Sequence, residues 1–386
     1  IEKENAMPPN ELQEMEELFE LYTPIDPVIP NLYLFENEWI DTVDGVSVRS
    51  MEHSAKDELV NAKRLFVFKE LYDLGGVTAI SNLIPRLTRP NILSHISSKF
   101  GLTENDETII ISWLSLDHED KYNQFAQAYT WSRSWTGELP WIKMAWDTVQ
   151  QQTKDPNIHA QFFLSIPLNI KNWELQESAE AEVQKVYWSK VVPYISSEQK
   201  VEMQYAIKKL MEAGRFITII NNMAYESDDL SSELLCEVML KAVTTQAEPN
   251  VNFDYHHINT LFEKLHLRTD VDLKLLAQLE WLYLPVFSYL TGYQPKTLHM
   301  ELTDNPDFFV EVVTYVYMPD ERTEENYTEE TLQEYFKKSD SGRKLLEGWN
   351  RIPGMADDGS VDKIVLAAWV NKAIEKGKGQ NCVYGV

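Results

Sequence analysis

Histidine spacing is the first sign of a metal-dependent hydrolase in a sequence. A zinc site on a helix places its histidines one turn apart on the same face. None of the eight histidines lies three or four positions from another. His256 and His257 are adjacent, so on a helix they would point in different directions. We therefore predict no metal site built on histidines, and no cofactor.

Acidic residues cluster at two places where metal ligands are conceivable. The run Asp117, His118, Glu119, Asp120 is the densest, but it lies where a helix is predicted to begin. Acidic side chains at that position accept hydrogen bonds from free backbone N–H groups and complement the helix dipole. The pair Asp228 and Asp229 lacks the further acid, two residues on, that a metal-binding motif of this type needs. We interpret both clusters as structural.

The segment 357–362 resembles half of a calcium-binding loop. When Gly359 is placed at the sixth position of an EF-hand loop, Gly354 and Ala356 occupy the first and third positions. Val365 then stands where the loop needs its bidentate glutamate. The mismatch favours a turn that caps the following helix.

Sequence motifs for phosphate, dinucleotide and acyl chemistry are missing. The chain contains no Gly-x-x-x-x-Gly-Lys-Ser/Thr, no Gly-x-Gly-x-x-Gly and no Gly-x-Ser-x-Gly. We therefore predict no catalytic residue. A site assembled from distant residues remains open, because such sites are defined by geometry and leave no local motif.

A stretch without acids is the first candidate for an interaction surface. Between Gly75 and Thr103 there is no Asp or Glu, whereas Arg86, Arg89 and Lys99 are present. In so acidic a chain, these cations could dock an acidic partner. The alternative is that the segment is buried and its charges are paired within the fold.

Aromatic residues form the second candidate surface, between Phe125 and Trp146. Trp131 and Trp135, with Arg133 between them, belong to the residue types that dominate binding energy at interfaces. Their helical spacing also fits packing in a core.

The elements that must position these residues are predicted to be helices from residue 57 onward. Helical periodicity and named stop signals mark segments 57–74, 90–101, 117–137, 196–214, 253–267, 271–289, 306–317, 328–337 and 361–376. A short acidic helix is expected at 10–22, and segment 31–49 is the one place where a short hairpin fits. We predict an all-α fold, either an irregular helical-repeat array (an α-solenoid of the HEAT kind) or a large multi-helix bundle.

Length and charge restrict the classes of function. The 386 residues exceed the usual size of one core, and we expect parts at 1–50, 51–250 and 251–386. A net charge of −26 argues against binding nucleic acid or an anionic membrane surface. No apolar run reaches the roughly 18 residues of a spanning helix. The two cysteines, Cys236 and Cys382, cannot form a disulfide framework, and no secretion signal is visible, which predicts a cytoplasmic protein.

Three phrases in the last half of the chain carry a resemblance. They are residues 279–287 (Leu-Glu-Trp-Leu-Tyr-Leu-Pro-Val-Phe), 297–319 with Asn-Pro-Asp-Phe-Phe-Val-Glu-Val-Val, and 345–354 followed by Asp-Asp-Gly. They resemble the C-terminal helical region of large, mostly uncharacterised bacterial proteins, and the resemblance extends loosely upstream to 187–214. It implies a helical architecture within a longer protein and no active site.

These observations favour a non-catalytic helical scaffold that contacts a protein partner or other domains of a longer parent chain. The alternative is an all-α enzyme, such as an α/α-toroid hydrolase acting on carbohydrate. That enzyme needs paired carboxylates and long loops, which are usually rich in glycine, and the chain has 14 glycines. A purely structural module within a larger assembly is a third possibility.

Overall fold

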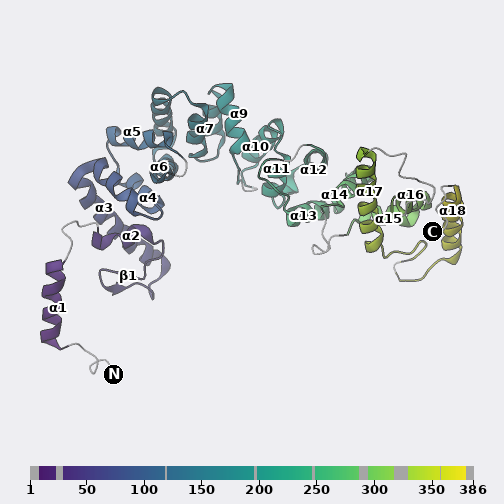
Figure 1. The fold of residues 1–386 in the computed structure, drawn as a ribbon, viewed down its shortest axis with the longest axis horizontal. Helices are drawn as coiled ribbons and strands as arrows, with labels where there is room; N and C mark the ends of the chain where they lie inside the picture. Colours follow the sequence, from purple (N-terminus) through teal and green to yellow (C-terminus); the bar gives the residue numbers. More distant parts are fainter. Residues whose placement is uncertain are drawn as a thin grey trace. The chain divides into compact units, whose positions relative to one another are not determined.

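Helices build both parts of the chain in the computed structural model (Figure 1). The structure describes residues 8–22, 29–117, 120–194, 198–245, 248–286, 294–316, 329–356 and 358–379. The chain divides into two units, Ile1–Val191 and Val192–Val386, which are described separately. This division differs from the three ranges expected from the sequence, which remain a prediction.

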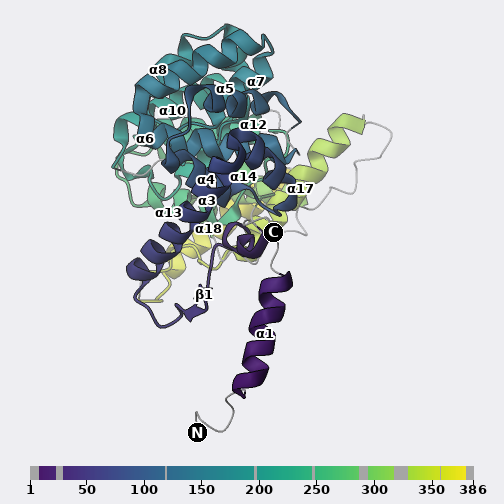
Figure 2. The same ribbon diagram turned by 90° about the vertical axis from the view of Figure 1, so that its left-hand side faces the viewer.

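The first unit holds nine of the described α-helices and a short hairpin. Its elements are α1 (Pro9–Tyr22), α2 (Tyr33–Glu36), β1 (Thr42–Val43), β2 (Val46–Ser47), α3 (His53–Leu83), α4 (Asn91–Phe100), α5 (Glu104–Ser112), α6 (Lys121–Gln152), α7 (Pro156–Leu164), α8 (Ile170–Glu177) and α9 (Ala181–Lys190). Helix α4 packs against α3 and α6, α6 also contacts α5 and α7, and α9 contacts α7 and α8. Figure 2 turns this unit toward the viewer and shows α3 and α4 side by side there as well.

The hairpin lies inside segment 31–49 and confirms that prediction. Thr42 pairs with Ser47, and Val43 pairs with Val46. Asp44 and Gly45 form the turn, both with positive φ (48° and 78°). An Asp-Gly pair is favoured there because the tight hairpin turn requires positive φ at both central residues.

Helices α3 and α6 each consist of two helical segments joined at a non-helical residue. In α3 the joint is Gly75 and Gly76, and Gly76 has a φ of +58°. The sequence predicted a helix end at this point. In α6 the joint is Glu138, with a φ of +50°. Pro140 follows in the first turn of the second segment, where its missing N–H group costs no hydrogen bond.

Other predicted helix ends are confirmed or corrected by the capping contacts. Gly101 ends α4 in the left-handed conformation, as predicted. Asp117 is not the cap of α6; the side chain of Asp120 accepts a hydrogen bond from the backbone N–H of Tyr122. A 3-10 turn at Trp113–Ser115 extends the preceding helix and displaces the start of α6 toward the C-terminus. His118 and Glu119 of the same run lie outside the described residues.

The second unit holds the remaining described helices. They are α10 (Lys200–Glu212), α11 (Phe216–Met223), α12 (Ser232–Thr244), α13 (Tyr255–His266), α14 (Leu273–Tyr283), α15 (Lys296–Asp304), α16 (Pro306–Val316), α17 (Glu329–Gly348) and α18 (Lys363–Gly379). Most contacts join helices close in sequence, such as α11 with α12, α14 with α15, and α15 with α16. Helix α16 also contacts α17 and α18.

Helix α16 begins where the sequence predicted a helix start, and α10 begins without a side-chain cap. The side chain of Asn305 accepts hydrogen bonds from the backbone N–H groups of Asp307 and Phe308, and α16 begins at Pro306 as predicted. Segment 196–214 was predicted to be helical, and α10 begins at Lys200 within it. Gln199 precedes α10 and makes no side-chain cap, and Ser196 lies outside the described residues.

The all-α prediction is confirmed, because the described residues form eighteen α-helices and one two-residue-per-strand hairpin. Packing between helices close in sequence occurs both in solenoids and in bundles. The α-solenoid therefore stays a prediction.

Gln176 on α8 is fully buried, and neither polar atom of its side-chain amide has a hydrogen-bond partner among the described residues. A buried amide without partners lowers stability by roughly 1–3 kcal/mol. We expect Gln176→Met to raise the free energy of unfolding by about 1 kcal/mol in urea denaturation, because methionine fills a similar volume without polar atoms.

The matched control is Gln184 on α9, whose amide donates hydrogen bonds to the backbone oxygens of Glu177 and Ala179. Gln184→Met should lower the free energy of unfolding by about 1 kcal/mol, since those bonds are lost. Equal effects of the two substitutions would show that the Gln176 amide is satisfied in solution.

Candidate functional site

Helix α4 presents a polar stripe on its exposed side. Asn91, His95 and Lys99 are exposed and follow one another at four-residue intervals. The opposite side is buried and includes Ser94 and Ser97, which are fully covered. Their small side chains let α4 approach α6 closely, and the Ser94 hydroxyl lies 3.1 Å from the backbone oxygen of Phe125 on α6. The close packing fixes which side of α4 faces solvent.

Helix α6, which packs against α4, exposes two tryptophans. Trp131 and Trp135 are 43% and 63% exposed, and their rings meet edge to face with centroids 6.0 Å apart. Ser132 lies between them in sequence, and its hydroxyl lies 3.3 Å from Nδ1 of His95 on α4. This contact joins the exposed side of α4 to that of α6.

Arg86 and Arg89 are exposed just before α4 begins, and their contact with a partner stays a prediction. The backbone around them is held by Lys121, whose ammonium group donates hydrogen bonds to the carbonyl oxygens of Pro85 and Leu87. Arg86 and Arg89 therefore lie toward the N-terminal end of α4, and Lys99 lies at its C-terminal end. The α4–α6 surface is defined here as Arg86, Arg89, His95, Lys99, Trp131 and Trp135.

The charge of His95 depends on its surroundings. Partial burial lowers the pKa of His95, and the positive charges of Lys99 and Arg64 lower it further. The imidazole is therefore neutral at pH 7, so the positive charge of this surface comes from its lysine and arginines.

Arg133, the sixth residue predicted to contact a partner, is engaged inside the fold. Its Nε donates a 2.8 Å hydrogen bond to the carboxylate of Glu107, and the guanidinium lies 5.5 Å from the ring centroid of Trp141. Its side chain is 24% exposed. We assign Arg133 a structural role, because a partner would have to compete with a buried carboxylate for it.

Glu107 on α5 is the centre of this buried cluster. Besides Arg133, its carboxylate accepts hydrogen bonds from the Tyr129 hydroxyl (2.8 Å) and the Trp141 indole N–H (3.0 Å). Burial, and next the charge of Glu107, raise the pKa of Tyr129, so that phenol stays protonated and remains a donor. The cluster ties both segments of α6 to α5. Sequence spacing gave no sign of it, because its members are far apart in the chain.

Aromatic residues of α6 thus divide into two groups. Tyr129, Trp141 and Trp146 are buried at 0%, 5% and 4% exposure. Trp131 and Trp135 are exposed. The first group packs in the core. The second group is exposed, as residues that contact a partner must be.

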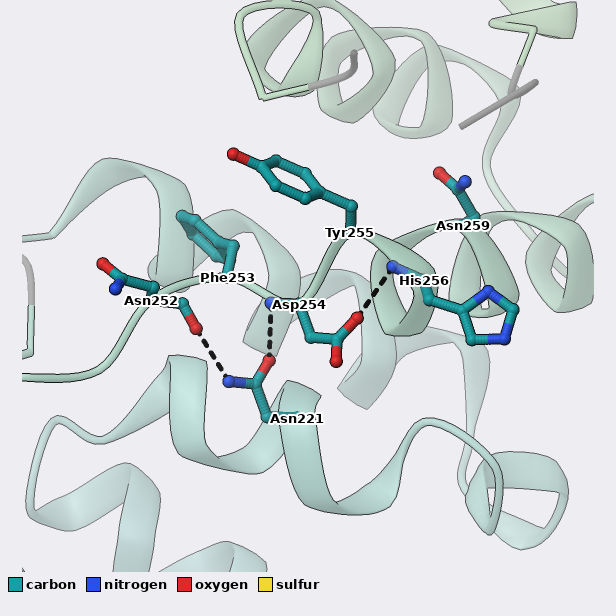
Figure 3. A pocket seen from close by; sticks show the side chains of 7 residues that line it. All are labelled: Asn221, Asn252, Phe253, Asp254, Tyr255, His256 and Asn259. Carbon is teal, nitrogen blue, oxygen red and sulfur yellow. Dashed lines mark hydrogen bonds between the residues drawn. The ribbon is translucent and has the colours of Figure 1, made fainter. Parts of the chain in front are cut away.

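A polar pocket of about 720 Å³ lies at the start of α13 in the second unit (Figure 3). The Asn221 amide donates to the backbone oxygen of Asn252 and accepts from the backbone N–H of Asp254. Asp254 caps α13 through the backbone N–H groups of His256 and His257. In Figure 3 the side chains of Tyr255 and His256 point away from each other. The polar groups here hold a loop and do not converge on a ligand.

The remaining acidic clusters have structural partners. Asp228 and Asp229 form ion pairs of 2.8 Å with Lys264 and Lys200. Asp362 caps α18 through the backbone N–H groups of Ile364 and Val365, and Asp357 lies outside the described residues. Within the described ranges, no group of three or more His, Cys, Asp or Glu side chains is arranged to hold a metal ion.

A search of protein-family models, curated proteins and solved structures found no match to this chain. The described helices include none that is long and apolar enough to cross a membrane. The resemblance to large bacterial proteins stays a prediction, and function must be inferred from the surfaces themselves.

Proposed function

We propose that this protein is a non-catalytic helical scaffold of the cytoplasm, part of a larger bacterial protein, that docks an acidic protein partner through the α4–α6 surface. The observation that carries the proposal is the combination of exposed cations, on α4 and just before it, with exposed tryptophans on α6, which contacts α4 through Ser132 and His95. The cations and the tryptophans contribute differently to binding.

The cations of the surface account for partner selection. The chain carries a net charge of −26, so most of its surface repels an acidic partner. The acid-free stretch that bears Arg86, Arg89 and Lys99 is a local exception. Complementary charge mainly raises the association rate and excludes wrong partners, and its effect decreases with salt.

The tryptophans account for affinity. Trp131 and Trp135 are 43% and 63% exposed to water. Covering this apolar surface with a partner would be favourable, because burial of apolar area lowers the free energy. Tryptophan is enriched among the residues that dominate interface energies, because a partner can cover its large rigid surface at little entropic cost.

Charge reversal tests the contribution of the cations. In Arg86→Glu/Arg89→Glu we expect slower association with a fluorescein-labelled peptide in which glutamates flank a Leu-Phe pair, and a weaker dependence of the rate on salt. Stopped-flow anisotropy measures both quantities. The free energy of unfolding should change by less than about 1 kcal/mol, because both side chains are exposed.

The matched control is Lys154→Glu/Lys190→Glu, which changes the net charge equally at exposed positions of the same unit. It should leave the association rate nearly unchanged. Trp131→Ala/Trp135→Ala should raise Kd about tenfold without altering the salt dependence, since about 1.4 kcal/mol of burial is lost. Equal effects of the two charge reversals, or unfolding of the arginine variant, would contradict the proposal.

A further inference from the structure

A groove lies between α14 and α15 in the second unit, with a volume of about 550 Å³. Its floor is apolar, because Ala277 and Trp281 of α14 and Phe308 of α16 pack against the core of this unit. Its rim carries Leu273, 64% exposed, and Met300, 49% exposed. Large apolar side chains gathered around a concave apolar floor are typical of binding grooves. The α14–α15 groove is defined here by these five residues and Asp304.

The spacing of the lining residues matches the surface that a helix would contact. Leu273, Ala277 and Trp281 follow one another at intervals of four along α14. Met300 and Asp304 have the same interval along α15. Rows of side chains four apart form the ridges and grooves into which the ridges of another helix pack. An amphipathic helix is thus the shape that these two rows fit.

Charge around the groove specifies which helix fits. Glu301 and Asp304 lie on its α15 side, and Lys274 is the cation among the described residues that line it. Asp304 is also the last residue of α15, where the helix dipole places partial negative charge. At the facing end, Asp272 caps α14 by accepting from the backbone N–H of Lys274. Negative charge therefore predominates at this end of the groove and favours a cationic ligand.

We propose that the α14–α15 groove binds an amphipathic helix of a partner protein, with its apolar face on Trp281 and Phe308 and with Lys or Arg residues beside Glu301 and Asp304. Met300 suits this task, because its flexible thioether adapts to different apolar side chains. The inference does not depend on the proposed function, since the groove lies in the other unit and selects the opposite charge.

The test uses the full chain and three fluorescein-labelled peptides, with binding measured by anisotropy. The first peptide has leucines along one helical face and lysines along the other. The second has the same composition in an order that forms no apolar face, and the third has glutamates in place of the lysines. We expect the first peptide to bind at least about tenfold more tightly than either of the others, a difference of about 1.4 kcal/mol.

Substitutions on the rim locate the binding. Leu273→Ser/Met300→Ser should weaken binding of the Leu/Lys peptide at least about tenfold, a difference of about 1.4 kcal/mol. Leu267→Ser, which alters an 85% exposed leucine of the same unit outside the groove, should leave binding unchanged. Asp304→Asn should weaken binding more than Glu237→Gln, which removes an exposed acid on α12. Thermal melting checks that the variants are folded, as expected for exposed positions.

Two results would overturn the inference. One is equal binding of the ordered and scrambled Leu/Lys peptides, which would mean that only net charge is sensed. The other is binding that Leu273→Ser/Met300→Ser leaves intact, which would place the contact elsewhere. Arg86→Glu/Arg89→Glu lies in the first unit and should not weaken this binding, so failure of this inference and failure of the proposed function are distinguishable.

Discussion

Replacing Glu107 with alanine is expected to lower the free energy of unfolding by about 3–5 kcal/mol. The carboxylate is 3% exposed and accepts hydrogen bonds from Arg133, Tyr129 and Trp141. Its removal leaves the half-buried Arg133 charge without its counter-ion and the buried Tyr129 and Trp141 donors without an acceptor, and each of these losses lowers stability. Urea denaturation followed by circular dichroism measures the change.

Two further substitutions make the Glu107 prediction specific. Glu107→Gln retains an acceptor oxygen and should cost less than alanine. Glu104→Ala removes an exposed acid from the first turn of the same helix and should cost at most about 1 kcal/mol, the size of a dipole interaction. If Glu104→Ala and Glu107→Ala cost the same, the buried cluster does not stabilise the fold.

Glu280→Ala is expected to have the second largest effect, about 3 kcal/mol. Glu280 on α14 is fully buried, and its carboxylate lies 2.8 Å from Nε2 of His266. It also accepts from the backbone N–H groups of Thr297 and Leu298, at the start of α15. Alanine leaves these first N–H groups of α15 without an acceptor, and because the N–H of Leu298 is buried, this costs more than the loss of an exposed cap.

The comparison for Glu280 is another acid that caps a helix but is exposed. Asp272 caps α14 through Lys274, and Asp272→Ala should cost about 1 kcal/mol. Chemical denaturation of both variants gives the two values. A cost for Glu280→Ala no larger than that for Asp272→Ala would show that water replaces the lost carboxylate.

Local signals in the sequence predicted much of the fold. Gly101, the Asp44 and Gly45 turn, and Asn305 before Pro306 each set backbone geometry through the residue itself. Such signals depend on a few neighbouring positions, so they can be recognised without knowledge of the tertiary structure. The wrong cap, Asp117 in place of Asp120, arose because several acids near one helix start compete for the same role.

Long-range pairing was beyond the reach of sequence patterns. Arginine is a residue type common at interfaces, but Arg133 on α6 forms an ion pair with Glu107 on α5. The helical spacing of the aromatic residues between Phe125 and Trp146 did not show which of them face solvent. Leu273 and Trp281 are likewise spaced as core residues, and only the packing of α14 leaves that row accessible. The exposure of a side chain depends on the residues packed around it, and the tertiary structure determines which residues these are.

The carboxylate that links α14 to α15 has a consequence for how the second unit opens. Glu280 belongs to α14 and satisfies the first N–H groups of the next helix, α15. Glu248, in the loop after α12, accepts in the same way from Ile217 and Thr218 at the start of the earlier helix α11. When α14 unfolds locally, α15 loses its acceptor at the same moment. Amide protons at the start of α15 should therefore exchange with solvent together with those of α14, as one cooperative unit.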